Sequence, residues 1–184
     1  MMFCIECGSN EVKLQIPTGD NRQRHICLAC NYIHYVNPRI ICGTLPTFNG
    51  QVLLCKREIE PRSGFWTLPA GFMENGESLS EAAYRETFEE ALATSVDLEL
   101  YTLCSLPHIN QVHIFYRCEI LDGKFGAGSE TLDAKLFDLA DIPWDELAFK
   151  TVAQCLEFYQ QDIQQGLFPI RSTTIKSPYQ TREA

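Results

Sequence analysis

Hydrophobic residues along this chain recur at two spacings, every second position in some segments and every third or fourth in others. The period of two, with short apolar runs between turn residues, predicts strands. Asn49-Gly50 lies between two such runs and predicts a tight hairpin. The longer period predicts a helix over residues 151–165 that ends at Gly166. The strands predicted in this way cover residues 12–16, 22–26, 40–48, 51–56, 96–104, 112–121 and 134–139.

A second helix is predicted from Ser78 onward. Ser78-Leu79-Ser80-Glu81 is a capping box, in which the serine oxygen and the glutamate carboxylate satisfy backbone N–H groups at the helix start. Glu86, Glu89 and Glu90 follow at positions i, i+3 and i+4, so their side chains share an arc of roughly 100°. One or two turns earlier the same arc is apolar, which indicates a stripe that does not face open water along its whole length.

Three carboxylates this close repel one another unless a cation lies between them. Arg85 can neutralise one of them, and Glu89 at i+4 is its natural partner. Carboxylate oxygens clustered without His or Cys suit Mg²⁺ or Mn²⁺. The alternative is a solvated acidic helix face. The apolar half of the stripe and the approach through Gly71 favour the metal site.

These residues resemble a known family. The Nudix box reads G-x5-E-x7-R-E-U-x-E-E-x-G-U, where U is a bulky aliphatic residue, and this chain departs from it at Thr87, Leu92 and Ala93, which leaves the helix packing and its final turn open. The resemblance implies an α/β fold, a Nudix-type α/β/α sandwich with a mixed sheet, and a metal set that includes Glu77. The matching positions are Gly71, Glu77, Arg85, Glu86, Glu89 and Glu90.

The first 36 residues contain two Cys-x2-Cys pairs separated by 19 residues. This spacing is typical of a structural zinc site with four thiolate ligands. A redox dithiol pair and two disulfides are the alternatives, and His25 is a weaker candidate ligand. So short and polar a segment needs a metal for its stability. The ligands expected for zinc are Cys4, Cys7, Cys27 and Cys30.

Three regions follow from these motifs: a zinc ribbon over residues 1–36, a Nudix hydrolase domain over 37–168 and a C-terminal tail over 169–184. Within the domain, Arg57, Trp66 and Gly71 are candidates for substrate binding, although Trp66 also fits the core. Glu130 ends a flexible segment, and the resemblance implies a further ligand or a general base there. Asp133 fits that role less well, and Glu90 remains the alternative base.

Composition limits the partners. The chain has 184 residues, of which 45% are hydrophobic, and a net charge of −9, which argues against a general nucleic-acid or anionic-membrane surface. It has no run of 18 apolar residues, so we expect no transmembrane helix. Cys4 follows the first Met almost at once and leaves no room for a signal peptide, so we expect a cytoplasmic protein.

A four-cysteine ribbon directly ahead of a Nudix domain resembles the NADH pyrophosphatase group. The SQPWPFP-type segment of that group is absent, and Ser105-Leu106-Pro107-His108-Ile109 stands in its region. The whole pattern looks more like the plant FAD pyrophosphatase type. That likeness implies a nucleoside diphosphate derivative as substrate, ADP-ribose or FAD cleaved with release of AMP, and a homodimer. The alternatives are a non-catalytic nucleotide- or RNA-binding module and hydrolysis of NADH or of an RNA 5′ pyrophosphate.

Overall fold

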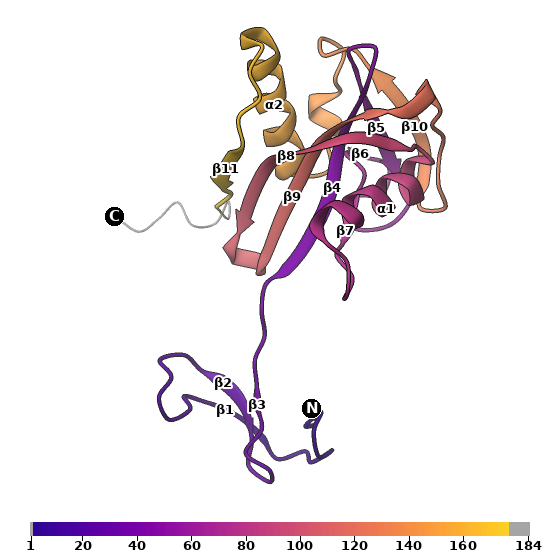
Figure 1. The fold of residues 1–184 in the computed structure, drawn as a ribbon. Helices are drawn as coiled ribbons and strands as arrows, with labels where there is room; N and C mark the ends of the chain where they lie inside the picture. The colour runs from indigo at the N-terminus through magenta and orange to yellow at the C-terminus, as the bar shows by residue number, and fades with distance from the viewer. Residues whose placement is uncertain (1, 177–184) are drawn as a thin grey trace. The chain divides into compact units, whose positions relative to one another are not determined.

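The structure is a computed structural model that describes residues 2–176. The chain divides into two compact units at Asn37 and Pro38, close to the boundary expected from the sequence. The first unit is a three-stranded antiparallel sheet in the order β1-β2-β3 (Figure 1). Its strands are β1 (Val12–Gln15), β2 (Arg24–Cys27) and β3 (Ile33–His34). The first two are the strands that the alternation predicted.

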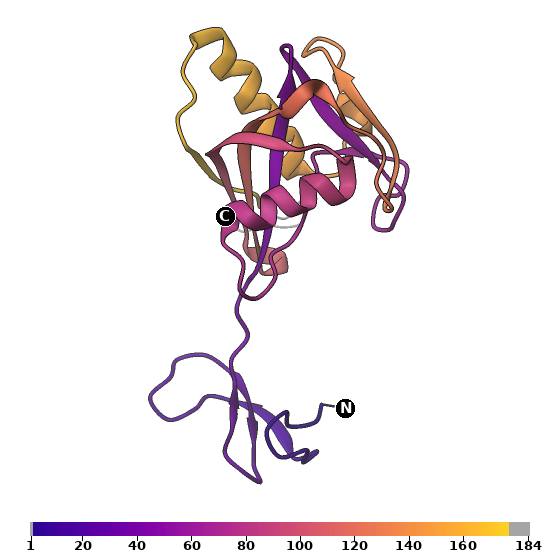
Figure 2. The ribbon, with the colours of Figure 1, turned by 45° about the vertical axis from the view of Figure 1, so that its right-hand side comes forward.

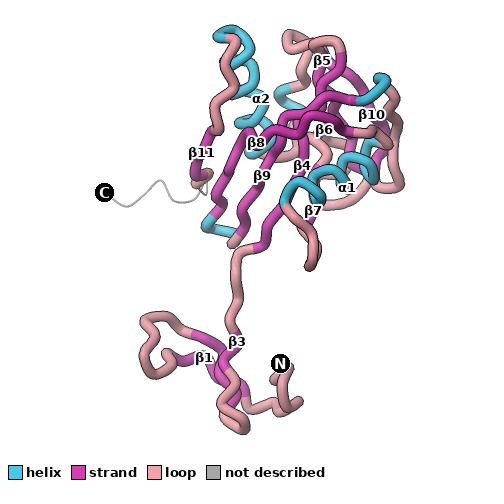
Figure 3. Tube along the Cα trace, in the orientation of Figure 1, coloured by secondary structure: helices cyan, strands magenta, loops and turns pink. Residues whose placement is uncertain are grey.

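The second unit is built on an eight-stranded sheet whose path runs β10-β5-β4-β9-β8-β11, with β6 paired to β5 and β7 paired to β4 (Figure 3). Two neighbouring pairs, β4 with β9 and β8 with β11, are parallel, and the other pairs are antiparallel, so the sheet is mixed. The strands are β4 (Arg39–Phe48), β5 (Gln51–Arg57), β6 (Trp66–Thr67), β7 (Ala70–Phe72), β8 (Ser95–Leu106), β9 (Gln111–Ile120), β10 (Thr131–Phe137) and β11 (Arg171–Thr174).

Helices α1 (Leu79–Ala91) and α2 (Lys150–Gln165) cover opposite faces of this sheet (Figure 2). Successive strand residues point to opposite faces, and the core clusters divide accordingly. On β5, Leu54 packs in the cluster that contains Leu156 of α2, whereas Leu53 packs in the cluster that contains Ala91 of α1. The expected α/β/α sandwich is therefore confirmed. Three 3-10 helices occupy connections, at Pro107–Ile109, Leu121–Gly123 and Trp144–Glu146.

The hairpin at Asn49-Gly50 forms as predicted, with positive φ at both residues, 50° and 82°. The strand expected over 134–139 differs, because it begins at Thr131 and ends at Phe137. Trp66 lies in the largest core cluster with only 7% of its surface exposed. Its ring meets the ring of Phe137 edge-on at 4.9 Å between centroids. Trp66 is therefore a core residue in this structure.

The main unit continues past residue 168, where the sequence analysis ended it. β11 adds a parallel strand beside β8. Arg171 of this strand pairs with Asp162 of α2, which is fully buried and also accepts a hydrogen bond from the hydroxyl of Tyr101 at 2.8 Å. Burial alone would raise the pKa of Asp162, but the hydrogen bonds from Arg171 and Tyr101 hold it below its usual value. A four-residue strand without apolar alternation leaves no pattern from which it can be predicted.

Among residues 2–176, no helix is both long and apolar enough to cross a membrane.

Candidate functional site

The start of α1 is fixed by the predicted capping box. The Glu81 backbone N–H donates to Ser78 Oγ at 3.3 Å, and the Ser78 backbone N–H donates to Glu81 Oε2 at 2.8 Å. A fixed helix start sets which side chains of the next three turns face the sheet. Ala82, Ala83 and Glu86 are buried on that side.

Thr87, one of the departures from the Nudix box, packs against the central strand β4. Its hydroxyl lies 2.6 Å from that of Thr44, and neither residue is exposed to solvent. Thr87 Oγ1 donates to the carbonyl of Ala83 at 2.7 Å, so Thr44 is the donor in the pair of hydroxyls. A hydroxyl pair thus replaces the aliphatic contact and fixes the rotation of α1 against β4.

β7 passes so close to α1 that only glycine fits at position 71. A Cβ built there would lie 2.3 Å from Cδ of Glu86 and 2.3–2.4 Å from its two carboxylate oxygens. On the other side of β7, a Cβ at Gly43 of β4 would lie 2.3 Å from the Cβ of Ala70. Gly71 was expected from the sequence to allow the close approach of a metal or phosphate. In the structure the group it admits is the Glu86 carboxylate.

Glu90 reaches the same strand one residue earlier. Its Oε2 accepts a hydrogen bond from the backbone N–H of Ala70 at 3.1 Å. Burial raises the pKa of Glu90 to about 7, and the charges of Glu86 and Glu130 act in the same direction, whereas the Ala70 hydrogen bond and the charge of Arg57 oppose it. Burial also raises the pKa of Glu86. Two sheltered carboxyl groups whose ionised forms are disfavoured by burial therefore face β7.

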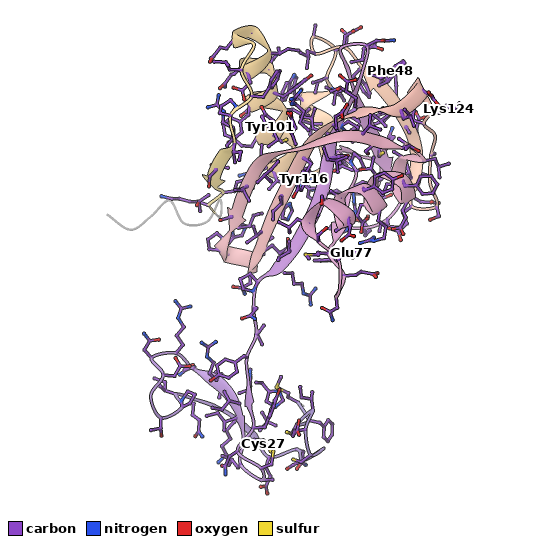
Figure 4. The ribbon with its side chains drawn as sticks, in the orientation of Figure 1. Cys27, Phe48, Glu77, Tyr101, Tyr116 and Lys124 are labelled. Carbon is purple, nitrogen blue, oxygen red and sulfur yellow. The ribbon has the colours of Figure 1, made fainter. Side chains whose placement is uncertain are left out.

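Arg85 holds the remaining acidic groups of the box. Its guanidinium contacts Glu77 through two nitrogens, Nε at 2.6 Å and Nη2 at 3.0 Å. Glu77 is labelled in Figure 4. Nη1 contacts Glu86 Oε1 at 2.6 Å and Glu89 Oε2 at 3.0 Å. The hydrogen bonds from Arg85 hold the pKa of Glu77 at about 2. The expected pair of Arg85 with Glu89 is present, as part of a larger network.

The C-terminal end of α1 is closed by the loop that leads to Glu130. The N–H of Gly128 donates to the carbonyl of Glu90 at 3.0 Å, and a Cβ at position 128 would lie 1.8 Å from the carbonyl oxygen of Glu89. Leu92 takes the left-handed conformation, φ 49° and ψ 27°, at the position where the box has glycine. Glu130 itself is exposed, and its carbonyl accepts from the N–H of Glu58 at 2.9 Å.

A cavity of about 510 Å³ opens beside Ala70 and Gly71. The expected binding residue Arg57 lines it, with its guanidinium 5.1 Å from the ring centroid of Phe149, and Trp66 does not line it. Phe149 lies at the start of α2, far from Arg57 in the sequence, so its place in this cavity could not be predicted from the sequence. The cavity is mostly apolar, and one polar part of its wall is a chain of three side chains from β9 and α2, Gln111, His113 and Thr151.

In that chain His113 Nδ1 lies 3.1 Å from Thr151 Oγ1, and Nε2 lies 3.0 Å from Gln111 Oε1. Burial lowers the pKa of His113 to about 4, so its ring is neutral at physiological pH. A neutral imidazole whose Nε2–H donates to Gln111 Oε1 accepts from the Thr151 hydroxyl at Nδ1. None of the three was predicted from the sequence, where Gln111 and His113 were only polar residues at the start of an apolar strand and Thr151 was only the first residue of the expected helix.

The four cysteines of the first unit come together as predicted. Their sulfur atoms all lie within 4.8 Å of one another, with Cys4 and Cys30 at 3.7 Å and Cys7 and Cys27 at 3.6 Å. All are free thiols, so the disulfide alternative is wrong, and His25 is not part of the group. Cys27 is labelled in Figure 4.

Backbone geometry prepares this cysteine group for a bound ion. Gly8 and Asn31 have positive φ and donate their N–H groups back to the carbonyls of Cys4 and Cys27, as two tight knuckles. Burial would raise the pKa of Cys27, but the N–H groups of Cys30 and Ala29 lower it to about 7. Cys27 can therefore ionise to a thiolate near neutral pH.

The fold is that of a known family of hydrolases. The family model of the NUDIX domain matches residues 38–156, and a zinc-ribbon model described as Nudix N-terminal matches residues 2–36. The chain belongs to the Nudix family, and its class is that of the pyrophosphohydrolases.

Three relatives place it within that family. A crystal structure of a NUDIX hydrolase from Nitrosomonas europaea superimposes with a TM-score of 0.92, is 46% identical, and covers 96% of this chain and 100% of its own. An ADP-ribose pyrophosphatase from Methanocaldococcus jannaschii is 31% identical over 124 residues, 64% of this chain and 71% of the relative. A NAD-capped RNA hydrolase from Vibrio atlanticus is 26% identical over 169 residues, and this chain spans only 60% of its length.

Proposed function

We propose that this protein hydrolyses the diphosphate of a nucleoside diphosphate conjugate, with ADP-ribose or FAD as the substrate and AMP as a product. The observation that carries the proposal is the position of two sheltered carboxylates. Glu86 and Glu90 both face Ala70 and Gly71, and those two residues also line the cavity of about 510 Å³. A conjugate bound in the cavity has its diphosphate beside these carboxylates.

The residues present fit a hard divalent cation. The donor set consists of carboxylate oxygens without His or Cys, which suits Mg²⁺ or Mn²⁺. Burial raises the pKa of both Glu86 and Glu90 in spite of the opposing charges of Arg85 and Arg57, so a further cation would stabilise their ionised forms. Glu86, Glu89 and Glu90 would hold the metal, which when bound would offset charge on the phosphoryl oxygens and acidify a water molecule.

The chain's own side chains divide the remaining tasks. Glu77, proposed from the sequence as a ligand, has both oxygens on Arg85, and its role is to position that guanidinium against Glu86 and Glu89. Arg57 is placed to neutralise a phosphate, because its charge already acts on Glu90. The proton of the attacking water goes to Glu90, which is sheltered, or to Glu130, which is exposed.

The four-cysteine group is proposed as a structural zinc site. Four thiolate ligands would fill the coordination sphere of zinc and leave no open position for substrate. Among the described residues 2–36 the buried side chains are few, so an ion would supply stability that this small core lacks; they are Cys4, Pro17, Ile26, Cys27 and His34.

The choice of an adenosine diphosphate conjugate is supported by the relative from Methanocaldococcus jannaschii, which is named an ADP-ribose pyrophosphatase. The test is incubation with Mg²⁺ or Mn²⁺ and each of ADP-ribose, FAD, NADH, NAD-capped RNA, diadenosine polyphosphates and GDP-sugars, followed by chromatography of the products. We expect AMP from ADP-ribose or FAD with the highest kcat/KM. A protein that binds these compounds and hydrolyses none of them is a binding module, and the proposal is then wrong.

A further inference from the structure

The cavity beside the two carboxylates is lined by cations without any acidic side chain. Of its eighteen lining residues four are Arg or Lys and none is Asp or Glu. The whole chain has the opposite balance, with 24 acidic and 15 basic residues. The four basic lining residues are Arg57, Arg62, Lys150 and Lys176.

None of these four cations forms an ion pair with another residue of the described range 2–176. Cations grouped around a concave and mostly apolar surface are a place where an anionic ligand is stabilised, since the low local dielectric strengthens each pair. The cavity therefore offers positive charge beyond what the scissile diphosphate would need, since the proposed metal ions would offset the charge of that diphosphate.

Of the four cations, Arg57 is the one whose charge is felt by the proposed catalytic carboxylates, because it lowers the pKa of Glu90. Lys150 comes from a separate element, as the first residue of α2. The first turn of α2 has no acidic residue, and no side chain caps it, so its N–H groups add to the same positive field.

Lys176 is brought to the cavity by β11. The N–H of Ile175 donates to the carbonyl of Ser105 at 2.9 Å, and Arg171 at the start of the strand is paired with the buried Asp162. These contacts hold β11 at its start and just after its end. Ile175 and Lys176 form part of the cavity wall.

We propose that the substrate carries a further phosphate group, apart from the scissile diphosphate, and that Lys150 and Lys176 bind it. This inference rests on the proposed function and narrows its substrate class to phosphorylated nucleoside diphosphate conjugates. A small conjugate is favoured over a nucleic acid, because about 510 Å³ holds a small ligand and a protein of net charge −9 repels a long polyanion. The phosphate is carried by either ribose, and the experiment distinguishes the two.

The test compares ADP-ribose with its 2′-phosphate, on the adenosine ribose, and with its 1″-phosphate, on the terminal ribose. We expect a kcat/KM about tenfold higher for one phosphorylated compound, expressed mainly in KM. Lys150→Gln and Lys176→Gln should each lower that preference about tenfold. Lys124→Gln is the matched control, since Lys124 is an exposed residue outside the cavity that pairs with Asp122 at 3.7 Å, and it should keep the preference. Lys124 is labelled in Figure 4.

Equal kcat/KM for all three compounds would overturn the inference, and so would an unchanged preference in both lysine variants, because these lysines would then serve the diphosphate alone. A lysine-dependent preference for NAD-capped RNA over both small phosphates would also overturn it. Calorimetric measurement of the binding of the same compounds to the Glu90→Gln protein tests the phosphate subsite separately from the proposed hydrolase activity. Tighter binding of a phosphorylated compound without any turnover by the native enzyme supports the subsite and refutes the hydrolase.

Discussion

Gly71 and Glu86 occupy positions that exclude any larger residue at 71, because a Cβ there would lie 2.3 Å from Cδ of the glutamate. Gly71→Ala should therefore displace the Glu86 carboxylate and lower kcat by about a hundredfold, since metal ligation depends on sub-ångström placement. Steady-state kinetics with Mg²⁺ measures this. Gly126→Ala is the control, because its new Cβ meets only Leu92 Cδ1 at 3.6 Å. Equal activity of both variants would show that Glu86 needs no fixed position.

Glu89→Gln and Glu90→Gln should each lower kcat by several orders of magnitude, about 10³-fold or more, because each removes a negative charge from the proposed metal site. Circular dichroism should show unchanged secondary structure. Glu157→Gln, on the exposed part of α2, is the matched control and should retain full activity. Near-normal rates in both active-site variants would remove these residues from the mechanism.

Thr44 and Thr87 should be energetically coupled. Thr87→Val leaves the buried Thr44 hydroxyl without its acceptor, which costs about 1–3 kcal/mol of unfolding free energy. Adding Thr44→Val removes the orphaned group, so the double variant should be more stable than the single Thr87→Val variant. Urea unfolding of the four proteins of this cycle gives the coupling energy. Additive effects would mean that the hydroxyl pair does not fix α1 on β4.

His113 should make the protein less stable in acid. Its pKa is about 4 in the folded chain and about 6.5 in an unfolded one, so the unfolded state binds the extra proton between these values. The unfolding free energy is unaffected above about pH 7.5 and falls as the pH drops through 6.5 toward 4, by about 2 kcal/mol at pH 5. His113→Gln should remove this part of the pH dependence. His108→Gln, at an exposed position of the same cavity, should leave it in place.

Removal of zinc should unfold the first unit alone. We expect one zinc ion per chain by mass spectrometry of the native protein, and loss of that ion after Cys27→Ser or treatment with a strong chelator. Amide NMR signals of residues 2–36 should then collapse toward random-coil shifts, while those of the second unit stay dispersed. Ser9→Ala, beside the cysteines but without a thiol, should keep its zinc. A well-dispersed ribbon without metal would contradict the structural role of the ion.

Side chains of the same type differ in their burial, and this difference is visible only in the folded structure. Tyr101 and Tyr116, labelled in Figure 4, lie on neighbouring strands β8 and β9, yet Tyr101 is buried with its hydroxyl on Asp162 and Tyr116 is only partly buried. In the same way Glu86, Glu89 and Glu90 share one helical arc, but Glu89 is exposed whereas Glu86 is 9% exposed. Helical spacing predicted their common direction, and the close contacts of Glu86 and Glu90 with β7 appear only in the folded structure.

The amino-acid order by itself determined α1 with its capping box, the Asn49-Gly50 hairpin, the long strands and the cysteine group, because each depends on contacts a few residues apart or on a fixed ligand spacing. Only the tertiary structure decided the cavity, since Arg57, His113 and Lys150 reach it from three elements far apart in the chain. The same holds for β7 and β11, whose three and four residues form strands only through pairing with β4 and β8. Such short strands gain their stability from non-local hydrogen bonds, which local propensity does not encode.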